Sequence, residues 1–369
     1  MTSPSPQCII VKVGTSTLTA GTSKLNRRRM LAIAQQLVQL REQGHQVVLV
    51  TSGAQAAGRE RLGYSTAPKE MPLRQMLAAV GQIQLMLAWE QVFGMFDVHV
   101  AQVLLTRADL GDRRRYLNAR DTLQAILQNG IVPVINENDA VATEEIRVGD
   151  NDNLSALVAN VLNADLLIIL TDQPGLFTAD PRKDANAQLI AHVPQINDEV
   201  KALAGGTKTG LGTGGMATKL QAAELATQSG TEVVIAQGTR ADVILDAVRG
   251  VSVGTRFAAQ VVEIVSRRRW ILTEQVVGAV IVDDGAARAV CESKSLLPVG
   301  VREVLAEFER GEVIAVRNTQ GKVIARGIAR YNASDAKRIA GKRSDEIGQI
   351  LGFDYAPMLI HADDMVVLV

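Results

Sequence analysis

The chain of 369 residues is longer than one hydrophobic core usually supports, so its length predicts two domains. Lysine plus arginine and aspartate plus glutamate number 39 each, and this balance gives no reason to expect nucleic acid or an anionic membrane as a main partner. The two cysteines lack metal-ligand spacing, the first residues lack signal-peptide features, and no apolar run approaches the roughly 20 residues of a membrane span, which predicts a reduced, cytoplasmic protein.

Short β-branched segments alternate with helical segments through the first 257 residues. Strands are predicted at 8–14, 46–53, 98–106, 130–136, 165–172 and 231–238. Apolar residues at spacings of three and four predict helices at 28–44 and 73–93, and a further helix is predicted at 216–229. This alternation predicts an α/β fold with a mostly parallel central sheet covered by helices on both faces.

The first two predicted strands end in turns that suit anionic ligands. Lys12 lies inside the first strand, and the turn at 14–16 reads Gly-Thr-Ser, whose backbone N–H groups and hydroxyls can hold phosphoryl oxygens. Alternatively, Lys12 belongs to an edge strand and extends its ammonium group into solvent. The Thr-Ser-Gly turn at 51–53 opens a helix in the same way, although an ordinary N-cap would also use a serine there. Right-handed crossovers gather both turns at the edge of the sheet where α/β folds bind ligands.

The fourth predicted strand runs into an acidic segment. Within residues 134–156, only Arg147 opposes six carboxylates, which are Glu137, Asp139, Glu144, Glu145, Asp150 and Asp152. Residues 150–153 read Asp-Asn-Asp-Asn and precede a predicted helix. Because an N-cap uses only one of these four side chains, the segment carries more polar groups than capping requires.

A glycine cluster precedes the helix predicted at 216–229. Gly210, Gly212 and Gly215 formally match G-x-G-x-x-G, but polar residues stand where a dinucleotide-binding unit needs a strand. Neither Gly-Lys pair of the chain is followed by Ser or Thr, so a P-loop is excluded. Lys219 falls in the first turn of the helix, where a cation opposes the helix dipole, and this favours an anion bound between them. The Thr-Asp pair at 171–172 is consistent with a ligand site or with an ordinary strand exit.

The pattern changes after Phe257. Valine- and isoleucine-rich strands follow one another closely with short helices between them, which predicts a second domain with a small, mostly antiparallel sheet. The arginine groups at 113–115 and 267–269 are typical of solvated faces, and their roles stay open.

Six segments, in this order and spacing, resemble the amino acid kinase family, in particular the branch that phosphorylates L-glutamate: "VKVGTS", "TSGAQAAGR", "INENDAV", "VGDNDNLSA", "LTDQPGLFTADPR" and "GLGTGGMATKLQAA". The resemblance implies an amino acid kinase domain at 1–257, a three-layer αβα sandwich, and a linker at 258–274. Residues 275–369, with a core at about 275–355, resemble a mainly β PUA domain. The implied reaction transfers the γ-phosphoryl group of ATP to the 5-carboxylate of L-glutamate, as the first step of proline synthesis.

The resemblance also implies roles for individual residues. The implied catalytic residues are Lys12, Lys219 and Asp152, with the aspartate orienting the two lysines. Glutamate binding is implied for Ser52, Gly53, Ala54, Asp139, Asp150 and Asn151. ATP binding is implied for Lys12, Gly14, Thr15, Ser16, Thr171, Asp172, Thr213, Gly214, Gly215, Met216, Ala217, Thr218 and Lys219. The acidic segment would then suit the α-ammonium group of glutamate. No general base is needed, because a carboxylate nucleophile is already deprotonated at neutral pH.

The resemblance implies ATP as co-substrate, Mg²⁺, a homotetramer, feedback inhibition by proline and delivery of the product to glutamate-5-semialdehyde dehydrogenase. No protein ligands for a metal are assigned, and neither a membrane nor nucleic acid is expected as a partner. Two alternatives stay open. One is a kinase of the same fold acting on N-acetylglutamate, aspartate or carbamate. The other is RNA binding by the PUA-like part, which the balanced charge and the few aromatic residues disfavour.

Overall fold

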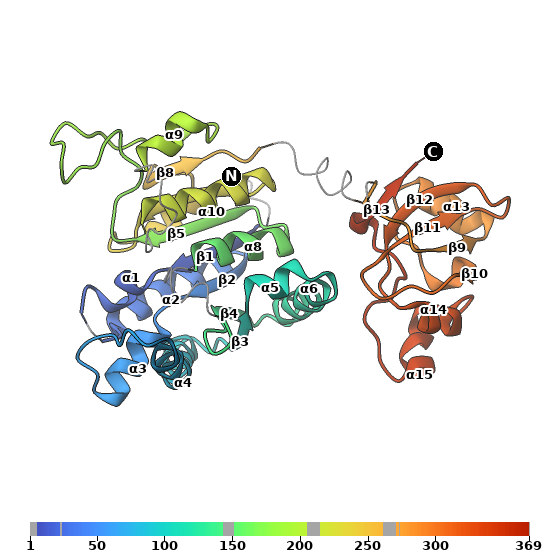
Figure 1. Cartoon of the computed structure of the whole chain (residues 1–369), viewed down its shortest axis with the longest axis horizontal. Coiled ribbons are helices and arrows are strands. Elements are labelled where there is room, and N and C mark those ends of the chain that lie inside the picture. Colours follow the sequence, from blue (N-terminus) through green and yellow to red (C-terminus); the bar gives the residue numbers. More distant parts are fainter. Residues whose placement is uncertain are drawn as a thin grey trace. The chain divides into compact units, whose positions relative to one another are not determined.

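The computed structural model describes residues 6–22, 24–142, 151–204, 215–260, 271–272 and 274–368. The chain forms two compact units (Figure 1). Unit 1 comprises Met1–Gly111 and Thr122–Val261, and unit 2 comprises Asp112–Asp121 and Val262–Val369. Within the described residues, no helix is both long enough and apolar enough to cross a membrane.

Unit 1 is built on an eight-stranded sheet with the order β3-β4-β2-β1-β5-β7-β8-β6. Every neighbouring pair from β3 to β7 is parallel, β8 is antiparallel to β7, and β6 is parallel to β8. The predicted mostly parallel sheet is confirmed. Its strands are β1 (Cys8–Val13), β2 (Gln46–Thr51), β3 (Val100–Leu105), β4 (Val132–Glu137), β5 (Leu166–Thr171), β6 (His192–Val193), β7 (Glu232–Gln237) and β8 (Gly254–Phe257). The sequence did not predict β6 and β8, because two and four residues are too few to display a strand pattern.

Helices cover both faces of this sheet. One face packs against α2 (Arg27–Glu42), α4 (Met71–Gly94) and α11 (Val243–Val248), and the main core lies there. On the other face, α8 (Asp152–Leu162) and α10 (Met216–Gln228) pack together and against β1, β5 and β7. Further helices are α1 (Thr15–Thr19), α3 (Ala54–Leu62), α5 (Arg107–Gly111), α9 (Asp198–Leu203) and α6 (Arg113–Gln128), whose residues up to Asp121 belong to unit 2. The predicted helices at 28–44, 73–93 and 216–229 are confirmed, with ends shifted by one or two residues.

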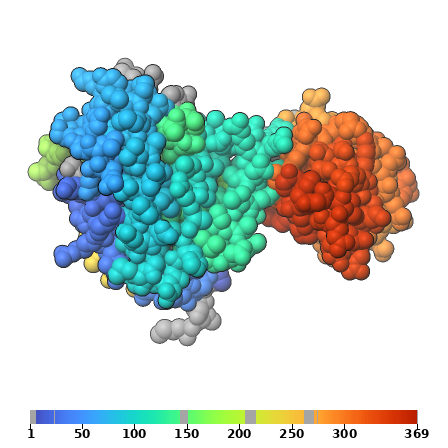
Figure 2. All heavy atoms as spheres, turned by 90° about the horizontal axis from the view of Figure 1, so that it is seen from below, coloured from blue at the N-terminus to red at the C-terminus, as the bar shows by residue number. Residues whose placement is uncertain are grey.

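Two glycines allow α3 and α4 to pack with their backbones in contact. A Cβ atom on Gly81 would lie 1.8 Å from the carbonyl oxygen of Ala54, and one on Gly58 would lie 1.9 Å from that of Leu77. Helix α4 therefore sits directly against the helix that follows β2. Its opposite side carries exposed apolar residues such as Ile83 and Leu87, and the light blue residues of these helices form much of the surface of unit 1 seen in Figure 2.

Unit 2 contains a five-stranded sheet with the order β10-β9-β11-β12-β13. All neighbouring pairs are antiparallel except β9 and β11, which confirms the predicted mostly antiparallel sheet. Its strands are β9 (Gly278–Val282), β10 (Val301–Leu305), β11 (Val313–Arg317), β12 (Val323–Ile328) and β13 (Met365–Val367). Short helices connect them: α13 (Asp284–Cys291), η1 (Pro298–Gly300), α14 (Ala333–Ile339), η2 (Ser344–Glu346), α15 (Ile347–Leu351) and η3 (Ala362–Asp364).

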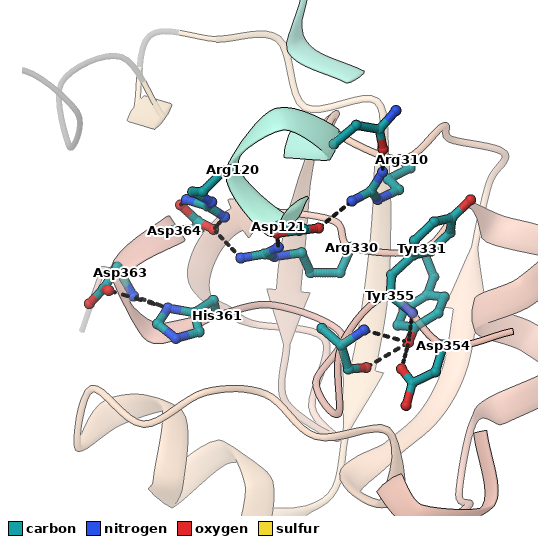
Figure 3. Close-up of polar contacts among 12 residues, drawn as sticks. Arg120, Asp121, Arg310, Arg330, Tyr331, Asp354, Tyr355, His361, Asp363 and Asp364 are labelled. Carbon is teal, nitrogen blue, oxygen red and sulfur yellow. Dashed lines mark hydrogen bonds and ion pairs between the residues drawn. The ribbon is translucent and has the colours of Figure 1, made fainter. Parts of the chain in front are cut away.

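A group of five charged side chains, the arginine cluster, joins the first turns of α6 to the rest of unit 2 (Figure 3). Arg120 forms a two-bond ion pair with Asp364, at 2.9 and 2.5 Å. Asp121 accepts hydrogen bonds from both Arg310 and Arg330. Arg330 also reaches Asp364 at 3.4 Å, so the two carboxylates are bridged.

Candidate active site

The strand order places several of the sequence-predicted loops side by side. Strands β4, β2, β1, β5 and β7 are consecutive and parallel, so the segments after their carboxyl ends meet along one edge of the sheet. Backbone hydrogen bonds join these segments. Gly14 N donates to Leu170 O at 3.4 Å, Ser52 N donates to Val13 O at 3.1 Å, and Gly238 N donates to Thr171 O at 2.8 Å. The segments that follow β2, β1, β5 and β7 are therefore adjacent along this edge.

Lys12 lies on the face of β1 that is opposite to the main core. Successive side chains of a strand point to opposite faces, and Ile9, Val11 and Val13 belong to the core shared with α2 and α4. Lys12 consequently points toward α8 and α10. It is 1% exposed, and its strand lies between β2 and β5. The alternative of an edge-strand lysine that reaches solvent is therefore wrong.

Asp152 brings two lysines together, and we call this group the lysine site. Its Oδ1 lies 2.5 Å from Lys12 Nζ, and its Oδ2 lies 3.1 Å from Lys219 Nζ. Thr218 Oγ1 also donates to Asp152 Oδ2 at 3.1 Å. All three charged side chains are buried. Segments that are 140 and 67 residues apart in the chain thus converge on one carboxylate, because β1, α8 and α10 meet at this edge.

Helix α8 is not capped as its sequence suggested. Its N-cap residue is Asn151, whose side chain makes no capping hydrogen bond, and Asp152 lies in the first turn. Asn151 is buried, and its Nδ2 instead donates to Thr51 O at 2.5 Å and to Asn136 Oδ1 at 2.6 Å. The side chain at the N-cap position therefore does not cap the helix, because the turn directs Asn151 toward β2 and β4.

The turn after β2 leaves its serine free of a capping role. Gly53 is the N-cap of α3 and makes no side-chain capping bond, so the alternative of a capping serine is wrong. Its φ of 101° is a conformation that glycine adopts without strain. Ser52, Gly53 and Ala54 are all buried at the edge of the sheet.

The remaining predicted site residues lie on several segments that follow strands of this sheet or begin helices. Gly14 is the N-cap of α1, and Thr15 and Ser16 in its first turn are exposed. Thr171 ends β5, and its Oγ1 donates to Asp172 Oδ1 at 3.0 Å. Asp139 follows β4 and is half-buried. Gly215 is the N-cap of α10, whose first residues are Met216, Ala217, Thr218 and Lys219. Asp150, Thr213 and Gly214 lie outside the described residues.

The structure adds two buried amides that the sequence interpretation did not select. Asn136 Nδ2 donates to Gln82 Oε1 at 2.7 Å, and Asn136 Oδ1 accepts from Asn151. Asn136 belongs to the family motif "INENDAV" and directly precedes the acidic segment, so the sequence could have marked it as a candidate site residue. Gln82 lies within an apolar helix, where no sequence pattern distinguishes it. Only its contact with Asn136 connects it with the other buried amides.

The described residues contain no group of three or more His, Cys, Asp or Glu side chains that could hold a metal ion. A magnesium ion bound by nucleotide phosphates needs only one or two protein carboxylates and keeps several waters. Such an ion does not require a cluster of three protein side chains, so the described residues fit a magnesium ion that is bound by nucleotide phosphates.

Two family models match the chain. The model described as amino acid kinase family matches residues 7–237, and that described as PUA domain matches residues 278–351. The chain belongs to the amino acid kinase family. A solved carbamate kinase from Giardia lamblia bound to AMP-PNP has the same fold, with a TM-score of 0.51 at 18% identity, covering 69% of this chain and 99% of that one.

Relatives that match over the whole chain indicate a particular branch of this family. A protein of Photobacterium profundum named Glutamate 5-kinase is 56% identical over 100% of this chain and 98% of its own length. Another of that name, from Sodalis glossinidius, is 53% identical over 98% of this chain and 99% of its own length. The resemblance predicted from the six sequence segments is thereby confirmed.

Proposed function

We propose that this protein transfers the γ-phosphoryl group of ATP to the side-chain carboxylate of L-glutamate and forms glutamyl 5-phosphate. The observation that carries the proposal is the lysine site, where two buried ammonium groups share one carboxylate at the strand edge. The relatives named Glutamate 5-kinase support the choice of substrate.

The reaction brings a carboxylate toward a triphosphate, so repulsion between anions dominates its barrier. Positive charge and N–H donors that are fixed in advance around the transferring group lower that barrier. Lys12 and Lys219 would each donate to oxygens of this group while Asp152 holds both ammonium groups in place. The turn at 14–16 and the first residues of α10 would hold the neighbouring phosphates. Mg²⁺ would arrive with ATP and neutralise phosphate charge.

Glutamate would lie beside this site, along the ends of β2 and β4. The buried turn of Ser52, Gly53 and Ala54 offers N–H groups and a hydroxyl to a substrate carboxylate. Asp139 and Asn151 would accept hydrogen bonds from the α-ammonium group. A kinase acting on N-acetylglutamate would not need such acceptors, since acetylation removes that charge.

The proposal extends to cellular context. We infer that the reaction is the first step of proline synthesis in the cytoplasm, that proline inhibits it at or near the glutamate site, and that a homotetramer delivers the product to glutamate-5-semialdehyde dehydrogenase. We also propose that the kinase domain ends at residue 257 and that the PUA-like domain begins at residue 275. The resemblance of the whole chain to the glutamate-phosphorylating branch supports these points.

The direct test is glutamate-dependent ADP release by the purified full chain, with hydroxylamine present to trap the acyl phosphate as a hydroxamate. We expect hydroxamate with L-glutamate and ATP, little with N-acetylglutamate, and inhibition by added proline. ADP release that does not depend on glutamate, or that prefers aspartate or carbamate, would contradict the proposed substrate.

A further inference from the structure

A chain of three buried side-chain amides runs from the backbone of β2 to helix α4. Asn151 Nδ2 donates to Thr51 O at 2.5 Å and to Asn136 Oδ1 at 2.6 Å, and Asn136 Nδ2 donates to Gln82 Oε1 at 2.7 Å. Asn151, Asn136 and Gln82 are all at least nine-tenths buried. The chain thus links strand β4, the start of α8 and a helix that carries none of the predicted site residues.

The backbone carbonyl at one end sets the direction of the whole chain. A carbonyl oxygen only accepts hydrogen bonds, so Asn151 must turn its NH₂ group toward Thr51. That NH₂ group then faces an oxygen of Asn136, and the NH₂ group of Asn136 faces an oxygen of Gln82. Amide orientations are assigned from hydrogen-bond networks of this kind, and here only one assignment satisfies all three contacts.

This direction determines what Asn151 presents to a substrate. Both hydrogens of its NH₂ group are used, so its remaining polar atom is the acceptor Oδ1. Within the described part of the chain no residue donates to this oxygen. The oxygen is also not fully buried, so a ligand can reach it. Asn151 therefore offers an acceptor, and not a donor, at the edge of the sheet, which is what an ammonium group requires.

Gln82 closes the far end of the chain, where its own Nε2 is buried and has no hydrogen-bond partner. Leaving a buried donor unpaired costs free energy, and an apolar residue in this apolar helix would avoid that cost. The retained contact is the one from Oε1 to Asn136. Without it, the NH₂ group of Asn136 would be buried without an acceptor, which costs free energy and leaves Asn136 Oδ1 less firmly placed against the NH₂ group of Asn151.

We propose that Gln82 is a positioning residue for substrate recognition: through Asn136 it holds in place the amide of Asn151, whose direction Thr51 O sets, so that its Oδ1 accepts a hydrogen bond from the α-ammonium group of the amino acid substrate. The proposal rests on the proposed function. It assigns a role in substrate selection to helix α4, which close glycine packing holds against α3, the helix that begins at the turn of Ser52, Gly53 and Ala54.

The test compares Gln82→Met with Gln84→Met, which makes the same change two residues away on a half-buried side chain of the same helix that lies outside the amide chain. For Gln82→Met we expect the KM for glutamate to rise roughly tenfold while the KM for ATP changes less than about twofold, a tenfold change being 1.4 kcal/mol. Gln84→Met should leave both constants unchanged.

A second readout separates positioning from general loosening of the site. Glutarate has both carboxylates of glutamate but no α-ammonium group, so Gln82→Met should lower kcat/KM for glutamate about tenfold and leave the value for glutarate unchanged. Gln82→Glu keeps an oxygen facing Asn136 and should restore most of the preference for glutamate. This variant also keeps the proposal testable if Gln82→Met does not fold.

The two levels of proposal fail in different ways. If the unaltered protein forms no hydroxamate from glutamate, the proposed function is wrong. If the unaltered protein forms it but Gln82→Met keeps the normal KM for glutamate, or raises the KM values for both substrates equally, only the positioning role is overturned. An unchanged preference for glutamate over glutarate in that variant would also overturn it.

Discussion

Each unit of this protein contains a buried cluster of cations around carboxylates, and the two clusters differ in chemistry. The lysine site of unit 1 uses two ammonium groups, which are compact charges with three donors each. The arginine cluster of unit 2 uses planar guanidinium groups that pair side-on with Asp121 and Asp364. The lysine site lies where strands end and helices begin, whereas the arginine cluster joins a helix to the interior of its unit.

The surroundings of the arginine cluster complete its bonding. Arg310 also donates to Asn118, and its guanidinium lies 4.0 Å from the ring centre of Tyr355, whose ring is tilted against that of Tyr331. Burial raises the pKa of Tyr331 to about 12, so its hydroxyl stays protonated at physiological pH. The comparison teaches that a buried ion cluster by itself does not indicate an active site. The position of the lysine site at the carboxyl edge of a parallel sheet is what supports the catalytic role proposed for it.

The largest effect should come from breaking the arginine cluster. Asp364→Ala leaves Arg120 and Arg330 without a shared carboxylate in a buried position, and such a loss costs about 3–5 kcal/mol. Urea denaturation of the full chain should show unit 2 unfolding at lower urea. Asp345→Ala, which removes one partner of an exposed ion pair, is the matched control and should change stability by less than about 0.5 kcal/mol. Equal effects of the two changes would mean that the cluster does not stabilise unit 2.

Breaking the lysine site should affect the reaction more than the fold. Lys219→Ala should lower the turnover number by about 10² or more, as does removal of one fixed electrostatic donor in other enzymes. Lys201→Ala, which removes an exposed lysine paired with Glu224, should leave turnover unchanged. Steady-state rates of ADP release provide the measurement. A near-normal turnover number for Lys219→Ala would remove this residue from the proposed mechanism.

Changes at the residues proposed to bind the α-ammonium group should affect KM and not turnover. Asn151→Ala removes the acceptor proposed for the α-ammonium group, and we expect the KM for glutamate to rise about tenfold with a much smaller change for ATP, as for a contact equal in the ground and transition states. Asp139→Ala should behave similarly. Initial rates over a grid of both substrate concentrations separate the two constants, and equal increases would count against a glutamate-specific role.

The smallest effect concerns one cysteine in each unit. Burial, together with the nearby charge of Asp165, raises the pKa of Cys8 to about 12, whereas Cys291 is exposed. A thiol with a raised pKa stays protonated and unreactive below that pH. Iodoacetamide at pH 8 should therefore modify Cys291 first, which peptide mass spectrometry can measure. Because the folded pKa of Cys8 exceeds the unfolded value, its contribution to stability is present below pH 9.0 and is lost as the pH rises toward 12. Faster modification of Cys8 would contradict this assignment.

The sequence by itself determined the strands and helices with strong local patterns. The β-branched runs that became β1, β2, β5 and β7 and the apolar spacing of α2 and α4 are properties of neighbouring residues, so they were predicted within a few positions. The family motifs also selected Lys12, Asp152 and Lys219 before their contacts were known. The two-residue strand β6 and the uncapped start of α8 lacked such a pattern.

Only the tertiary structure decided which distant side chains meet. Gln82 contacts Asn136 across 54 residues of sequence, and Arg120 contacts Asp364 across 244. Neither pair leaves a local signal, because a glutamine in an apolar helix and an arginine near other arginines look like ordinary surface residues until the packing of the helices is known. Local sequence fixes the conformation of a segment, whereas contacts between segments depend on strand order and on how closely the helices can approach.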